Sequence, residues 1–121
     1  MAIKPSDSIL LAVRKACLAS DDFSDYFDKD LIPITNSVFA ILLQVGIGPR
    51  TGFAIEDETA TWQEFFDSCD DPCNPMLGMV KPYVTTKTHL LFDPPQNPTV
   101  LEALKQACAE YEWRLNISVD P

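Results

Sequence analysis

Apolar residues recur every three or four positions along most of the chain, and this spacing predicts helices, because it places the side chains on one helix face. The first such segment covers residues 9–17, with Ser6 as its expected N-cap. The longest covers residues 22–44 and contains Pro33, which must either kink this helix or divide it. A turn at residues 46–49, rich in Gly and Pro, ends it.

The second half of the chain predicts three more helices. A short one is capped by Thr59 or Thr61, and a longer one follows over residues 76–92 and ends before a run of prolines. The last begins at Asn97 and Pro98, because Asn is a favourable N-cap and Pro suits the first helical position. The apolar face of the short helix is aromatic, and we expect it in the core: Trp62, Phe65 and Phe66.

These patterns predict one mostly α domain over residues 1–121, a compact bundle of four or five helices with a short strand or hairpin-like segment near residues 52–56. A lone strand at residues 53–55 needs a partner. In a small helical chain that partner could be another copy of the same protein, because an unpaired edge invites pairing between subunits.

The charge balance restricts the partners. The chain has 9 Lys and Arg against 18 Asp and Glu, a net charge of -9. Nucleic acids and anionic membranes attract proteins through Lys and Arg, so neither is an expected partner. The longest apolar runs, at residues 9–13 and 38–43, are far shorter than a membrane span, and no cationic and apolar leader precedes them. We therefore expect a soluble, intracellular protein.

The residue types that carry chemistry are present but do not form recognisable sites. Cys69 and Cys73 lack the second Cys or His pair that a structural zinc site needs. The glycines of residues 46–52 depart from the dinucleotide-binding spacing and follow a predicted helix where a strand is required. His89 stands alone, without a nucleophile motif, and is typical of a surface or half-buried helix histidine. We expect no metal, no cofactor and no enzymatic activity.

Several longer motifs occur in a characteristic order along nearly the whole chain: residues 36–39, 43–49 and 52–55, Trp62, Phe65, and residues 80–83, 90–95 and 110–116. In this order they resemble the small head-tail connector proteins of long-tailed bacteriophages. The most specific elements are Phe-Asp-Pro-Pro at residues 92–95 and Glu-Tyr-Glu-Trp-Arg-Leu-Asn at residues 110–116. The segment at residues 67–75 is longer than the linker that the connector proteins have at the same place.

The resemblance implies a helical adaptor in the neck of the virion, assembled in the host cytoplasm. It implies a homo-oligomeric ring, commonly of twelve copies, that joins the portal protein to a stopper or tail-completion protein. DNA would only pass through the lumen of the ring. In such a ring each subunit needs two different complementary surfaces. The residues that we expect at the subunit or portal interface are Phe53, Ile55, Trp62, Phe92, Trp113 and Arg114.

Two other functions remain open at this point. An acidic inhibitor that mimics DNA and binds a nucleic-acid enzyme fits the net charge, but it needs carboxylates in long stripes along one face. Here the acidic residues gather at loops and helix starts. A small enzyme would have to use His89 or the thiols.

Overall fold

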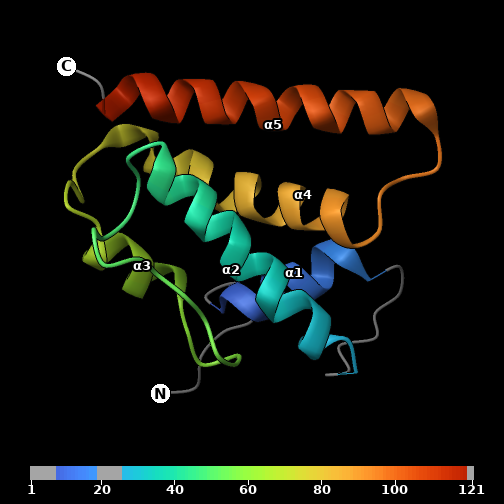
Figure 1. Ribbon diagram of the computed structural model, residues 1–121, viewed down its shortest axis with the longest axis horizontal. Coiled ribbons are helices and arrows are strands. Elements are labelled where there is room, and N and C mark those ends of the chain that lie inside the picture. The colour runs from blue at the N-terminus through green and yellow to red at the C-terminus, as the bar shows by residue number, and fades with distance from the viewer. Residues whose placement is uncertain (1–7, 19–25, 120–121) are drawn as a thin grey trace.

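The computed structural model describes residues 8–18 and 26–119, and this part of the chain is mostly helical (Figure 1). The predicted bundle of helices is confirmed. Its elements, in chain order, are α1 (Ile9–Cys17), α2 (Asp28–Gln44), α3 (Trp62–Ser68), the 3₁₀ helix η1 (Pro75–Met79), α4 (Val80–Phe92) and α5 (Pro98–Val119).

Helix α4 is the centre of the bundle. It contacts α1, α2 and α5, and Figure 1 shows α5 lying along the molecule above it while α1 and α2 cross below. A chain of this size has one core, and the side chains of all five α-helices contribute to it. Its largest fully buried members are Ile9, Leu10, Leu31, Phe39, Leu42, Ile55, Phe65, Tyr83 and Leu115.

The helix starts follow local side-chain chemistry. The N-cap of α1 is Ser8, whose hydroxyl accepts a hydrogen bond from the Leu11 amide, and not the expected Ser6, which lies outside the described residues. For α3 the structure selects Thr61, which forms a capping box with Glu64. The Asn97 side chain accepts hydrogen bonds from the first-turn amides of α5, as predicted.

Helix α2 is shorter than the sequence suggested. It begins at Asp28, after a turn at residues 26–27, and residues 22–25 lie outside the described part of the chain. Pro33 lies inside α2 without dividing it. Pro82 is the third residue of α4, where an amide hydrogen has no partner within the helix in any case. Both prolines are therefore compatible with continuous helices.

The segment at residues 52–56 is not helical, and the described residues contain no strand there; they contain one isolated bridge, between Ser8 and Thr61. The partner of the segment is a side chain. Asn36 of α2 donates to the carbonyl oxygen of Ile55 and accepts from the Ile55 amide. The expected strand is thus replaced by an irregular segment that the Asn36 side chain of α2 holds.

A buried ion pair joins three parts of the fold. Arg14 of α1 is 5 % exposed, and its Nε donates to Oδ1 of Asp28 at 2.9 Å. Its Nη1 lies 3.5 Å from Oε2 of Glu58, in the loop before α3. Because a charge in the interior needs a partner, this contact fixes the start of α2 against α1 and the loop.

Candidate interaction surface

Helix α5 is long but shallowly packed. Of its 22 residues, only Cys108 and Leu115 are buried. Polar contacts add to the attachment: the Tyr83 hydroxyl of α4 donates to Oε2 of Glu112 at 2.8 Å, and Nζ of Lys87 lies 3.6 Å from the same oxygen. One face of α5 therefore binds α4, and the rest of the helix faces away from the subunit.

The outward face of α5 carries two large apolar side chains. Trp113 is 59 % exposed and Ile117 is 49 % exposed. They are four residues apart, so they are neighbours on one side of the helix, opposite the buried Leu115. Beside them Arg114 donates to the Glu110 carboxylate, an exposed pair one helical turn apart. We call Trp113, Ile117, Glu110 and Arg114 the α5 patch.

The carboxyl end of α5 is fixed against the turn that follows α2. Gly46 has a φ of +95°, and a Cβ atom there would lie 2.6 Å from Cγ2 of Val119, so only glycine permits this approach. Asn116 donates to the Val45 carbonyl oxygen at 3.5 Å, and Asn74 donates to Ser118 at 2.9 Å. These contacts set the direction in which the α5 patch points.

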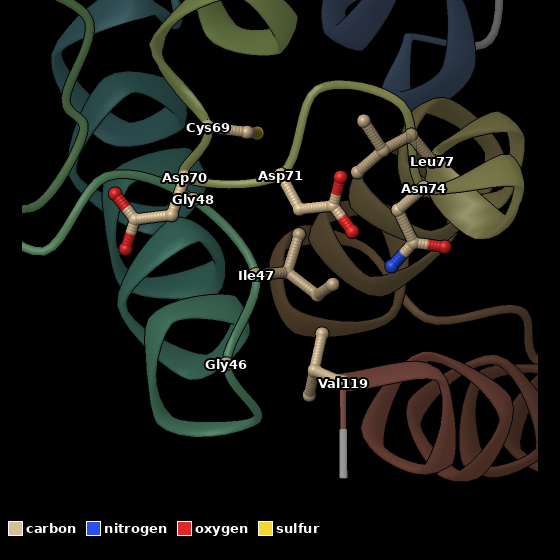
Figure 2. A pocket seen from close by; sticks show the side chains of 9 residues that line it. All are labelled: Gly46, Ile47, Gly48, Cys69, Asp70, Asp71, Asn74, Leu77 and Val119. Carbon is tan, nitrogen blue, oxygen red and sulfur yellow. The ribbon is translucent and has the colours of Figure 1, made fainter. Parts of the chain in front are cut away.

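A small cavity lies at this junction. Figure 2 shows Ile47, Val119, Asp71 and Asn74 around a common space, whereas the Asp70 carboxylate points away from the others. Its volume of about 10 Å³ is at the lower limit for one water molecule and far below that of a ligand pocket. The junction is therefore a packing contact and not a small-molecule site.

Three of the four thiols, those of Cys17, Cys69 and Cys108, are buried. Burial raises the pKa of Cys17 to about 12, and the nearby Asp93 carboxylate adds to this effect. Burial also raises the pKa values of Cys69 and Cys108. All three thiols are protonated near neutral pH, and the thiolate is the reactive form. In the described part of the chain no group of three or more His, Cys, Asp or Glu side chains could hold a metal ion.

His89 gives no sign of a catalytic arrangement. It is half-buried on α4, as expected for a helix histidine, and its Nδ1 atom has no hydrogen-bond partner among the described residues. A general base needs an orienting partner and a nucleophile within reach.

None of the described helices has the length and apolar content that crossing a membrane requires.

The structure places the six expected interface residues in three kinds of environment. Ile55 and Trp62 are 2 % and 4 % exposed, so their side chains are taken up by the core of the subunit. Phe53 and Phe92 are half-buried; Phe53 packs 5.0 Å from Phe39, and Phe92 packs 5.6 Å from Phe27, measured between ring centroids. Trp113 and Arg114 are exposed. The interface role of the six residues stays a prediction.

Ile117 is an exposed apolar residue of α5 that is not among the six expected interface residues. The signal was present: the buried side of α5 is marked by Leu104, Cys108 and Leu115, and Ile117 lies on the other side, one turn after Trp113. The periodicity of α5 therefore assigns both Trp113 and Ile117 to the solvent face, and the structure shows both exposed.

The fold and the surface together define a small helical protein with an exposed apolar pair, Trp113 and Ile117, on its last helix. The chain matches the family described as "Phage connector protein" over residues 9–121. It therefore belongs to the phage connector protein family, and the resemblance noted in the sequence is confirmed. It is a structural component of a bacteriophage that associates with other head-tail proteins. No significant match to the chain is found among curated proteins or among solved structures.

The raised pKa of Cys17 predicts that the stability of the protein falls at alkaline pH. In the unfolded chain this thiol ionises near pH 8.5–9, and in the folded chain only near pH 12. Between these pH values the folded state keeps a proton that the unfolded state has lost, so a rise in pH favours unfolding. The stabilisation from this proton is complete below about pH 8.5 and is lost as the pH rises to 12. Between these two pH values Cys17 should lower the free energy of unfolding by about 1.4 kcal/mol for each pH unit.

Urea unfolding at pH 8, 9, 10 and 11 measures this slope. Cys17→Ala should reduce it by about the amount of one thiol, whatever the substitution costs at neutral pH. Cys73→Ala is the matched control, because Cys73 is exposed, and its slope should equal that of the wild type. Equal slopes for wild type and Cys17→Ala would contradict the assignment.

Proposed function

We propose that this protein forms an oligomeric ring in the neck of the virion, between the portal protein and the next neck or tail component, and that the α5 patch is one of the surfaces by which its copies associate. Its role is mechanical and not catalytic. The match to the connector family over residues 9–121 supports the place in the particle. The observation that carries the ring is the exposure of Trp113 and Ile117 on the side of α5 that faces away from the core.

A large side chain on the outer side of a helix contributes less to the stability of its own subunit than a buried one does. Trp113 is one of the two tryptophans of the chain, and the other, Trp62, is buried. Trp and Arg are the residue types that most often dominate binding energy at protein interfaces. Trp113 beside Arg114 therefore has the composition of an interface centre.

The shallow packing of α5 supports the same proposal. A ring brings together two different surfaces of neighbouring copies, so each subunit gains burial on both sides. Small domains bury a smaller fraction of their surface than large ones, and association supplies the remainder. A helix of 22 residues with two buried side chains leaves most of one side available for such a contact.

The purified protein, alone and mixed with the portal protein of the same phage, tests the proposal by native mass spectrometry and negative-stain imaging. We expect closed rings, alone or on the portal. Trp113→Asp should lower the fraction of assembled protein at least tenfold, because it places a charge at the centre of the contact. Circular dichroism checks that the variant keeps its helices.

Val100→Asp is the matched control. Val100 is 45 % exposed and lies on the same helix, near its other end. It should assemble like the wild type if the patch at residues 110–117 is the contact. A protein that stays monomeric both alone and with portal protein would contradict the ring, and equal losses for the two variants would contradict the α5 patch as its contact.

A further inference from the structure

The non-helical segment at residues 53–56 has one side that is paired with α2 and one side that is free. On the paired side, the Asn36 side-chain amide donates from Nδ2 to the Ile55 carbonyl oxygen at 3.1 Å, and its Oδ1 accepts from the Ile55 amide at 2.7 Å. One residue that donates and accepts in the same direction has the hydrogen-bonded geometry of a β-strand. Asn36 thus acts as a one-residue neighbouring strand.

The free side carries the next residues in each direction. The Ile55 amide and carbonyl both meet Asn36, as the two groups of one residue do in an extended chain, where the next residue in each direction points its groups to the opposite side. By this geometry the groups of Ala54 and Glu56 point away from Asn36. Neither residue makes a backbone hydrogen bond within the described part of the chain, and both are exposed. They present a donor and an acceptor each, in the arrangement of an unpaired sheet edge.

The side chains hold this edge in place. Ile55 is 2 % exposed, and Phe53 packs at 5.0 Å from both Phe39 and Phe65, measured between ring centroids. An edge that is already held in the binding conformation pays less conformational entropy when a partner pairs with it. The packing of Phe53 and Ile55 therefore fixes the conformation of this exposed segment before a partner binds.

We propose that residues 53–56 are a docking edge that pairs, backbone to backbone, with an extended basic segment of a different protein. The charge follows from the residues that continue the edge. Glu56 is exposed and in no ion pair among the described residues, and Asp57 and Glu58 follow it directly. Lys or Arg side chains on the incoming segment would face the Glu56 and Asp57 carboxylates, while the Glu58 carboxylate lies against Arg14 and the backbone pairing supplies the alignment.

A second copy of this chain does not offer such a segment. Seven of the nine basic residues lie in α1, α2, α4 and α5, where the backbone is already paired within the helix. The other two, Lys4 and Arg50, are 46 positions apart in the sequence. The partner is therefore another protein, and this contact is independent of the ring that the α5 patch would form.

Titration of the ¹⁵N-labelled protein with a synthetic peptide, acetyl-Lys-Val-Lys-Val-Lys-Val-amide, tests the proposal by NMR. We expect saturable shift changes centred on the amides of Ala54 and Glu56, with slower hydrogen exchange at both. Ala54→Pro removes one of the free donors and should weaken binding at least tenfold. Glu56→Lys reverses one charge and should weaken it by a similar factor.

Two controls separate pairing from general attraction to an acidic protein. Glu102→Lys reverses an exposed acidic residue on α5 and should change the affinity less than twofold. A peptide with Glu in place of Lys should not bind. The Ile55 amide, which Asn36 holds, reports that each variant keeps its fold.

Three outcomes would overturn the proposal. Shift changes spread over the whole acidic surface, and equal in the Ala54→Pro variant, would mean electrostatic attraction only. Concentration-dependent changes at Ala54 and Glu56 without peptide would mean that a second copy occupies the edge. The absence of any change at these two amides would mean that the edge takes no basic strand.

Discussion

Replacing Asp28 by alanine should lower the free energy of unfolding by about 2–3 kcal/mol. This is less than the loss of about 3–5 kcal/mol found when a fully buried ion pair loses one partner, because Asp28 is part-buried and the Glu58 carboxylate stays beside Arg14. The substitution takes away the carboxylate that both accepts from Nε of Arg14 and lies against its Nη2. The Arg14 side chain is only 6 % exposed, so its charge cannot return to water without moving α1. A loss of this size is a large part of the stability of a small domain.

Asp30→Ala is the matched control for this prediction. Asp28 and Asp30 both lie in the first turn of α2, so both interact with the helix dipole, but Asp30 is exposed. The control should cost less than about 1 kcal/mol. Urea unfolding at one fixed protein concentration measures both variants, because association would otherwise add to the apparent stability. Equal losses would mean that the ion pair contributes no more than the dipole does.

The sequence predicted the helices because their causes are local. The apolar spacing of residues 9–17 and the Asn97-Pro98 start of α5 act within a turn or two of helix, and the structure reproduces both. Competing local signals were harder to separate. Two serines precede α1, and only the structure shows that Ser8 meets the Leu11 amide.

Long-range contacts explain what the sequence did not reveal. The segment at residues 52–56 has the apolar content of a strand, but the expected strand does not form there in the described part of the chain. Its partner, Asn36, is 19 residues away and belongs to a helix. Nothing in the alternation of apolar and polar positions indicates that a single side chain would replace a neighbouring strand.

Long-range contacts also explain why some candidate interface residues are exposed and others are buried. On the long helix α5 the periodicity alone assigns Trp113 to the side away from Leu115, so its exposure could be read from the sequence. Helix α3 has seven residues, too few for its pattern to decide between core and surface. Trp62 is buried because Phe39 of α2 packs against it, at 6.4 Å between ring centroids.

The role of Asn36 leads to the second large effect. Asn36→Ala should lower the free energy of unfolding by about 2–4 kcal/mol. The substitution removes both partners of the Ile55 backbone, and a buried amide or carbonyl group that loses its partner costs about 1–3 kcal/mol. Ile55 is 2 % exposed, so water does not readily replace the lost hydrogen bonds.

Ser37→Ala is the control, because Ser37 is exposed, is next to Asn36 on α2 and bonds only within its own helix, to the Ile34 carbonyl oxygen. It should change the stability by less than about 0.5 kcal/mol. Hydrogen exchange adds a local measurement: the Ile55 amide should lose protection in Asn36→Ala well before the amides of α4 do. If Ile55 stays protected and both variants are equally stable, the packing of Phe53 and Ile55 alone holds the segment, and Asn36 is a passive neighbour.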